Sequence, residues 1–178
     1  MINNRRNLRE CILYEKKIYF TGFADKLIKS FLRDKAYYIF KYQVYLRKSE
    51  YFHNNKKKIL YAIYRKKKNK LGIKLGFELW DNSFDIGLKI HHPGYIVVNG
   101  NCKIGKNCTL FGCNCIGNNG KDYSAPVIGD NVSIGFGASV FGDIYIANNV
   151  FIGAGAVVLD SIYEEGKIVV GIPAHVKE

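Results

Sequence analysis

Residues 97–162 repeat a short pattern with a period of six. When this segment is divided into sixes starting at Val97, the second position is aliphatic in ten of the eleven sixes. The exception falls within the polar stretch NNGKDYSAP, residues 118–126. A fixed short period indicates a solenoid, because one repeat is too small to bury its own apolar face and has to stack on its neighbours.

The period of six separates this fold from its competitors. An amphipathic helix repeats its apolar residues every ~3.6 positions, and a half-buried strand every ~2, without regular glycines. Each six therefore predicts a short strand with one inward aliphatic side chain, followed by a turn where Gly or Asn accepts unusual backbone angles. Three sixes make one triangular coil. We predict a mainly β fold, a parallel β-helix, in preference to a generic all-β domain with turn-rich loops.

The charge of the chain is divided between two regions. Residues 1–70 contain 20 Lys and Arg against 5 Asp and Glu, a net charge of +15, whereas residues 71–178 contain 7 against 10, a net charge of −3. Apolar residues in the first region, such as Phe23, Leu27 and Phe31, have helical spacing. We predict a small basic α-helical region over 1–75, with two or three helices, and a β-helix domain with a C-terminal tail over 76–178. Asn54 or Asn55 is the predicted cap of the last helix.

The basic region has several possible partners. A basic amphipathic helix can lie on an anionic membrane surface, attract an acidic glycan or pack against the rest of the protein. No segment resembles a nucleic-acid-binding module, so nucleic acid is an unlikely partner. The sequence has no signal-peptide pattern and no apolar run of the ~20 residues that cross a bilayer. The odd number of cysteines, five, favours reduced thiols. We expect a cytoplasmic protein, with peripheral association at the inner membrane face as one option.

The repeat resembles that of the hexapeptide-repeat acyltransferases, whose fold is a left-handed parallel β-helix. The ending GIPAHVKE is similar to the closing segment of that family, with Gly171, Pro173 and Ala174 in the matching positions. The likeness runs from about Gly76 to the C-terminus. It implies the handedness of the coil, acetyl-CoA as acyl donor, no metal, and a homotrimer in which each donor groove lies between two subunits.

The segment GLKIHHPGYIVVNG, residues 87–100, is most similar to the serine acetyltransferase branch and its sugar O-acetyltransferase relatives. The alignment implies that His92 is the catalytic histidine. An imidazole with a pKa near ~6.5 can accept the proton of a hydroxyl as it attacks a thioester, so transfer would be direct. An unbroken repeat would instead point His92 into the core. Pro93 and Gly94 predict a turn that disturbs the register at this point.

The resemblance implies further residues for the acceptor side of the site. The family pairs its histidine with an upstream carboxylate, and Glu78 is the first candidate, although it is one residue short of the family spacing. His91, Trp80 and Tyr95 are the predicted acceptor-binding residues. Trp80 offers an aromatic face for a sugar ring, but it could equally close the open end of the β-helix.

The resemblance also implies a donor groove of small residues along which the CoA arm lies. Lys121 is a candidate partner for a CoA phosphate. For any single glycine, a turn is the alternative explanation. The predicted donor-binding residues are Gly117, Lys121, Gly135, Gly137, Ala138, Gly153 and Ala154.

The chain departs from the serine acetyltransferases in ways that favour a carbohydrate hydroxyl as acceptor. Ala125 stands where that branch has a second substrate-contacting histidine, and His91 stands where it has an aspartate. We predict an acetyl-CoA-dependent O-acetyltransferase acting on a sugar hydroxyl of a bacterial surface polysaccharide, such as capsule or O-antigen, or on its precursor. The alternatives are serine O-acetylation, N-acetylation of an amino sugar, and a non-enzymatic β-helix scaffold. A metal site like that of γ-carbonic anhydrases is disfavoured, because residues 93–174 contain no histidine.

Overall fold

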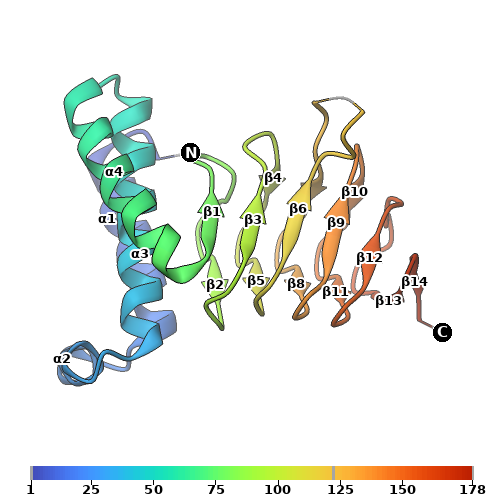
Figure 1. The fold of residues 1–178 in the computed structure, drawn as a ribbon, viewed down its shortest axis with the longest axis horizontal. Helices are drawn as coiled ribbons and strands as arrows, with labels where there is room; N and C mark the ends of the chain where they lie inside the picture. The colour runs from blue at the N-terminus through green and yellow to red at the C-terminus, as the bar shows by residue number, and fades with distance from the viewer. Residues whose placement is uncertain (1, 122, 178) are drawn as a thin grey trace. The chain divides into compact units, whose positions relative to one another are not determined.

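The structure is a computed structural model that describes residues 2–121 and 123–177. It consists of two compact units, residues 1–76 and 77–178, divided one residue after the predicted boundary. Figure 1 shows helices in the first unit and stacked coils of short strands in the second. Each unit is described by itself below.

The described part of the helical unit has four helices, where two or three were predicted. They are α1 (Arg5–Tyr19), α2 (Phe23–Phe31), α3 (Lys35–Asn54) and α4 (Lys58–Leu75). The predicted cap of the last helix was wrong. Asn54 ends α3, and Asn55 caps its C-terminus, with its side-chain amide donating to the Tyr51 carbonyl at 2.8 Å. The chain turns at Lys56, whose φ is positive, and the N-cap of α4 is Lys57, which makes no side-chain capping hydrogen bond.

An ion cluster lies in the interior of the helical unit. Arg47 of α3 is fully buried and contacts Glu15 of α1 (Nη2–Oε1 2.7 Å) and Glu50 of α3 (Nη1–Oε2 3.0 Å), which are themselves buried. Arg47 Nε also donates to Glu15 at 3.1 Å, so two nitrogens of the guanidinium bind the same carboxylate. Burial raises the pKa of the neighbouring Cys11 thiol to about 12. Nothing in the sequence pattern distinguishes these charges from the surface charges around them.

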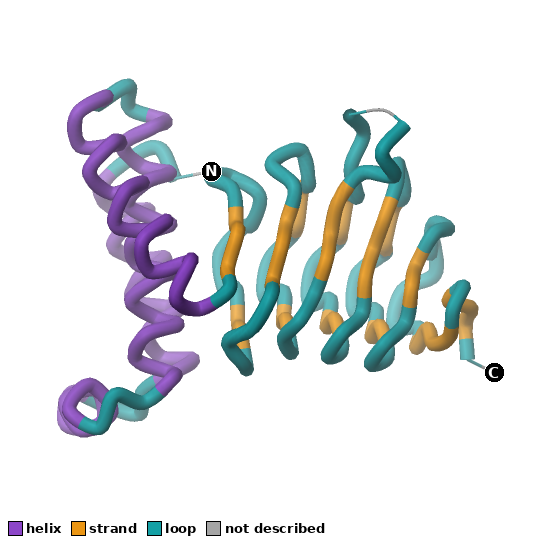
Figure 2. The backbone as a smooth tube through the Cα atoms, in the orientation of Figure 1, coloured by secondary structure: helices purple, strands orange, loops and turns teal. Residues whose placement is uncertain are grey.

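The second unit is a parallel β-helix with three faces (Figure 2). The first face is the sheet β1-β3-β6-β9-β12, the second is β4-β7-β10, and the third is β2-β5-β8-β11-β13-β14. All pairings are parallel except that of β14 with β13. The strands are β1 (Phe77–Leu79), β2 (Lys89–Ile90), β3 (Ile96–Val98), β4 (Lys103–Ile104), β5 (Thr109–Leu110), β6 (Cys115–Gly117), β7 (Val127–Ile128), β8 (Ser133–Ile134), β9 (Ser139–Phe141), β10 (Tyr145–Ile146), β11 (Phe151–Ile152), β12 (Val157–Val158), β13 (Ile168–Gly171) and β14 (Ala174–Val176).

The aliphatic second position of the repeat forms the core, as predicted. On the first face Val98, Ile116, Val140 and Val158 follow one another in register, and all are buried. Each buried aliphatic side chain stabilises the fold by ~1.5–3 kcal/mol relative to exposure. The one exception in the repeat is an insertion between β6 and β7, whose described residues, 118–121 and 123–126, extend beyond the coil (Figure 1). The mainly β fold is confirmed.

Asparagines hold the corner between the second and third faces. Asn107, Asn131 and Asn149 have left-handed backbone φ of 57°, 59° and 61°, conformations that asparagine tolerates better than most residues. Their side chains form a ladder in which each Nδ2 donates to the next Oδ1 at 3.0 Å. The Asn that recurs in the repeat therefore turns the chain and links successive coils.

Gly135→Ala is expected to destabilise the β-helix, whereas Gly117→Ala is expected to be tolerated. A Cβ on Gly135 would lie 2.5 Å from the backbone nitrogen of Ala154 and 2.7 Å from the carbonyl carbon of Gly153, in a stacked coil. A Cβ on Gly117 would meet only the Cβ of Asn99, at 3.5 Å. We expect Gly135→Ala to lower the free energy of unfolding in urea by ~1–3 kcal/mol and Gly117→Ala to change it by less than ~0.5 kcal/mol. Equal effects would contradict the coil packing described here.

Candidate active site

One corner of the β-helix collects the histidine pair and most of the predicted donor residues. We call it the His92 corner, and it joins the third face to the first in successive coils. It consists of residues 91–95, 111–114, 135–138 and 153–156. Because each segment stacks on the next, residues that lie about twenty positions apart in the sequence become neighbours here.

The side chain of His92 is exposed at this corner. The core position before it is occupied by Ile90, which pairs in register with Leu110, so the repeat register does shift between this coil and the next. A Cβ on Gly112 would lie 3.3 Å from the Cβ of His92 and 3.1 Å from the ring of Phe136. Gly112 therefore lies close against both side chains, and a methyl group at this position would be crowded.

The ring of His91 packs in a row of aromatic side chains. Its ring is nearly parallel to that of Phe111, with centroids 4.5 Å apart and an interplanar angle of 7°, and its backbone N–H donates to the Leu110 carbonyl at 2.9 Å. Phe111 meets Phe151 edge-on, with centroids 6.4 Å apart. The ring centroid of His91 lies 6.3 Å from that of His92. This arrangement suits His91 to lining a binding surface beside His92.

A buried asparagine fixes the backbone of the His92 corner. Asn114 accepts a hydrogen bond from the Gly112 N–H at 3.0 Å and donates to the carbonyls of Gly135 (2.7 Å) and Ala138 (3.1 Å). It therefore ties two adjacent coils together directly below the histidine pair. The sequence analysis missed Asn114, Gly112 and Phe136. Their common signal was their place between a strand of the third face and the next strand of the first face, which becomes visible only once the faces are assigned.

The predicted donor residues divide between two corners. Gly117 ends β6 and Lys121 lies in the loop that follows, so both belong to the corner between the first and second faces. The other five lie at the His92 corner; they are Gly135, Gly137, Ala138, Gly153 and Ala154.

The fold itself explains why several of these positions are small. Gly153 has no room for a Cβ, which would lie 2.8 Å from a methyl of Val170, and Gly137 has a left-handed φ of 73°. Ala138 is fully buried, because it occupies the small inward position of its repeat, so its side chain cannot contact an external ligand. The prediction for Ala138 therefore concerns its backbone, and it stays a prediction. Ala154 is the predicted donor residue with an exposed side chain at this corner.

The residues predicted for the acceptor side of the site, Tyr95, Glu78 and Trp80, lie at different places on the β-helix relative to His92. Tyr95 belongs to the His92 corner and is strongly exposed. Glu78 is exposed in the middle of β1, in register with Val97, so it is on the first face. Trp80 directly follows β1 at the corner between the first and second faces, half-exposed, where a Cβ on Gly100 would lie 3.2 Å from its ring. The structure thus places Tyr95 in the same corner segment as His92 and Trp80 on the other side of the first face.

Residues 125–160 match the family model described as bacterial transferase hexapeptide (six repeats). Hexapeptide repeats therefore build the coils over these residues. The chain is also similar in fold to solved serine acetyltransferases. The soybean apoenzyme is 22% identical, with a TM-score of 0.78, over 97% of this chain and 69% of that one. A search of curated proteins gave no match.

Two further solved structures contain small molecules. A serine acetyltransferase in complex with CoA is 18% identical (TM-score 0.73; 97% of this chain and 70% of that one). The Neisseria gonorrhoeae serine acetyltransferase in complex with serine is 20% identical (TM-score 0.71; 98% and 70%). At these identities the likeness shows the fold. The predicted left-handed parallel β-helix, preceded by helices, is confirmed as the fold.

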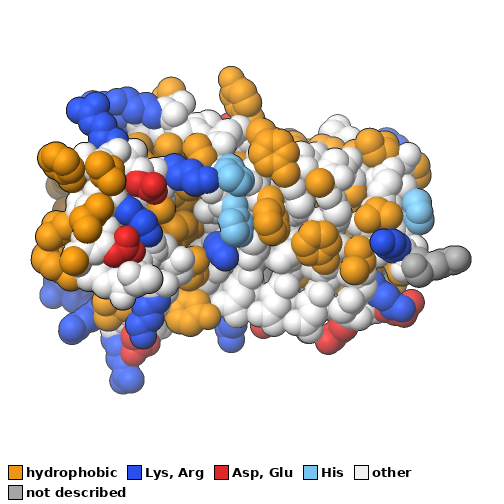
Figure 3. Space-filling view, turned by 90° about the horizontal axis from the view of Figure 1, so that it is seen from below, with side chains coloured by type: hydrophobic (Ala, Val, Ile, Leu, Met, Phe, Trp, Pro, Cys, Tyr) orange, Lys and Arg blue, Asp and Glu red, His pale blue; other side chains and the backbone are white. Residues whose placement is uncertain are grey.

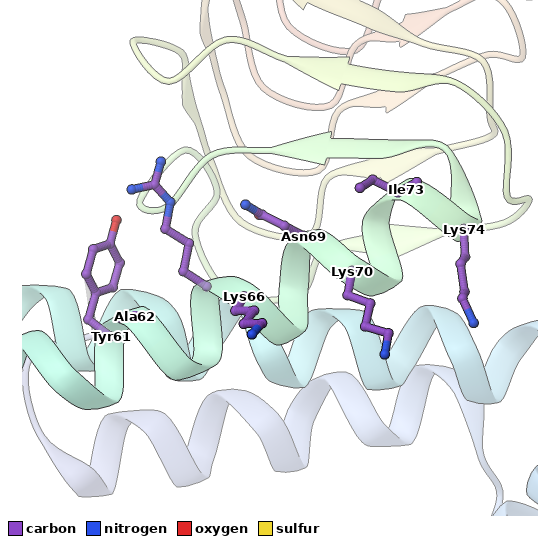
Figure 4. A pocket seen from close by; sticks show the side chains of 8 residues that line it. Tyr61, Ala62, Lys66, Asn69, Lys70, Ile73 and Lys74 are labelled. Carbon is purple, nitrogen blue, oxygen red and sulfur yellow. The ribbon is translucent and has the colours of Figure 1, made fainter.

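An open hollow of about 770 Å³ lies along one face of α4 (Figure 4). Four of its side chains are cationic, so this face attracts anions. Its lining residues are Tyr61, Ala62, Arg65, Lys66, Asn69, Lys70, Ile73 and Lys74. Within residues 2–121 and 123–177, no three His, Cys, Asp or Glu side chains are grouped as metal ligands. None of the helices described in those ranges combines the length and apolar character that crossing a bilayer requires.

Proposed function

We propose that this chain is an acetyl-CoA-dependent O-acetyltransferase with His92 as its general base. The observation that carries the proposal is the exposed His92 at a corner of the β-helix that Asn114 ties together, with the stacked ring of His91 next to it. The CoA complex among the similar solved structures supports the choice of donor.

The reaction needs one proton acceptor and a surface for each substrate. Neutral His92 accepts the proton of the acceptor hydroxyl while the hydroxyl oxygen attacks the thioester carbonyl. The carbon–sulfur bond then breaks, the acetyl group stays on the acceptor oxygen, and the CoA thiolate takes up a proton as it leaves. Gly137 and Ala154, exposed at the same corner, are proposed to contact the CoA arm, and Glu78 to orient His92.

The acceptor is proposed to be a sugar hydroxyl of a bacterial surface polysaccharide or its precursor. His91 and Tyr95 beside His92 offer ring faces of the kind on which sugars stack, and Trp80 offers another at the far corner. Serine is the second candidate acceptor, because the similar solved structures include a serine acetyltransferase with serine bound. The amine of an amino sugar is the third.

Two further features belong to the proposal. A homotrimer, formed through the β-helices, would place each donor groove between two subunits. The helical unit would bring the chain to an anionic partner, an acidic glycan or a membrane surface. The cationic hollow on α4 supports the second feature.

The test is acetyl transfer from acetyl-CoA to a panel of acceptors, followed by mass spectrometry. The panel contains sugar nucleotides, neutral and acidic polysaccharides, amino sugars and serine. One acetyl group gained on a glycan oxygen is the expected result. Transfer to serine would keep the mechanism and replace the acceptor. Failure to bind acetyl-CoA, measured by calorimetry, would overturn the proposal and favour a scaffold.

A further inference from the structure

The short helix α2 exposes its apolar side chains and turns its polar side chains toward the helical unit. No residue of α2 is buried, and Asp25, Lys26 and Lys29 are its half-buried side chains with charge. A surface helix normally has the opposite arrangement. The large apolar side chains of α2 and its C-cap are between 54% and 87% exposed; they are Phe23, Leu27, Ile28, Phe31 and Leu32.

The orientation of α2 is fixed by its polar side. Lys29 Nζ donates to the backbone carbonyl of Tyr19 at 2.9 Å and to Asp25 Oδ2 at 3.1 Å. The same ammonium lies over the ring of Phe20, 5.5 Å from its centroid. Because one side chain makes contacts with both the preceding helix and α2 itself, the helix cannot roll to bury its apolar face without losing them.

Two more contacts hold the same side. Lys26 Nζ lies over the ring of Phe40 at 5.4 Å. Asp25 accepts a hydrogen bond from the backbone N–H of Thr21 at 3.0 Å. This bond, followed by that from Lys29, holds the pKa of Asp25 below its ordinary value. The Asp25 carboxylate thus bonds to groups of the helical unit, and the exposed apolar face of α2 carries no acidic group.

The charge of the helical unit decides which partner suits this face. Residues 1–76 contain 21 Lys and Arg against 5 Asp and Glu, a net charge of +16. Two copies meeting through α2 would bring these positive charges together, whereas an anionic surface would be attracted. Exposed Arg33 and Lys35 directly follow α2. Figure 3, which looks at the molecule from below in the view of Figure 1, shows hydrophobic side chains gathered on the helical unit, with lysines and arginines near them.

We propose that α2 docks the protein on an anionic lipid bilayer, with its apolar face inserted at the boundary between headgroups and acyl chains. A short helix of this character lies in the plane of the interface with its apolar face ~5–10 Å deep. Arg33 and Lys35 contact the lipid phosphates from the end of the helix. This inference names the partner of the helical unit and does not require acetyl transfer.

The test is co-sedimentation of the full-length protein with vesicles, without acetyl-CoA. We expect binding to phosphatidylcholine vesicles that contain phosphatidylglycerol, and much weaker binding to pure phosphatidylcholine. The double substitution Leu27→Ser with Phe31→Ser should weaken binding at least ~10-fold, because two large apolar side chains no longer insert. Both residues are exposed, so the variant should keep the helical circular dichroism of the wild type.

A matched pair on α4 provides the control. Ile59 and Ile63 are 80% and 42% exposed, lie outside the cationic hollow and have the same spacing as Leu27 and Phe31, so Ile59→Ser with Ile63→Ser removes exposed apolar surface from another helix. This variant should bind vesicles as the wild type does. Equal weakening by both pairs, no effect of the α2 pair, or no binding of the wild type would each overturn the inference.

Insertion can be separated from adsorption and from self-association. Leu27→Trp in a Trp80→Phe background places the only tryptophan on α2. Its emission should shift to the blue and be quenched by brominated acyl chains when anionic vesicles are added. Unchanged emission would overturn insertion. If the α2 pair instead changes the oligomeric state in sedimentation velocity, and vesicles are not bound, α2 is a contact between copies and the inference fails. Acetyl transfer, measured separately, reports on the proposed function alone.

Discussion

Replacing His92 with alanine is expected to lower the rate of acetyl transfer by ~10²–10⁴-fold, the usual contribution of a positioned general base. The acceptor hydroxyl then has to lose its proton to water, because the exposed imidazole that we propose as its proton acceptor is gone. The measurement is kcat and KM for acetyl transfer with the acceptor identified in the panel. The fall should appear in kcat, while the affinity for acetyl-CoA, measured by calorimetry, should be unchanged.

Two other histidines serve as controls for this substitution. His175 lies on β14, paired with Val170 and away from the His92 corner, so His175→Ala should leave the rate unchanged. His91→Ala removes the ring that stacks on Phe111 and should raise the KM for the acceptor more than it lowers kcat. A rate for His92→Ala within a factor of three of the wild type would remove His92 from the mechanism. A larger loss in kcat for His91→Ala than for His92→Ala would transfer the role of base to His91.

The predictable parts of this protein are those that depend on period alone. The inward aliphatic column from Val98 to Val158 follows directly from the spacing of six, because an inward position in one coil stays inward in the next. The exposed position of His92 also follows, since a Pro-Gly turn shifts the register locally. The donor residues stay predictions. Ala138 has the small size of a groove residue and the inward position of a core residue, so the fold by itself already explains its size.

What the sequence could not predict depends on contacts between distant residues. Phe111, Gly112 and Phe136 lie next to the histidine pair only because coils of unequal length place them at one corner, and one of those coils contains the insertion between β6 and β7. In the helical unit, α2 has the spacing of an ordinary amphipathic helix, and the sequence pattern does not say which side faces the protein. Contacts such as that of Lys29 with the Tyr19 carbonyl set that orientation.

Arg47→Met is expected to give the largest loss of stability, ~3–5 kcal/mol, within the helical unit. The substitution keeps the apolar length of the side chain but leaves Glu15 and Glu50 buried without a cation. The triple substitution Arg47→Met, Glu15→Leu and Glu50→Leu removes all three buried charges. It should restore most of the lost stability, because a buried ion cluster is about as stable as an apolar cluster of similar volume. Arg6→Met, which removes an exposed arginine paired with Glu10, should cost less than ~1 kcal/mol.

Two buried cysteines can report where the stability is lost. Burial raises the pKa of Cys11 in the helical unit and of Cys108 in the β-helix to about 12 each, so neither thiol reacts with an alkylating reagent at pH 8 until its own unit opens. A pulse of alkylation across a urea series, followed by mass spectrometry, gives a midpoint for each unit. In Arg47→Met the midpoint of Cys11 should fall while that of Cys108 stays within error of the wild type. If both midpoints fall together, the two units unfold as one, and the loss applies to the whole chain. If neither falls, Arg47 does not neutralise the buried carboxylates, and the ion cluster does not stabilise the helices.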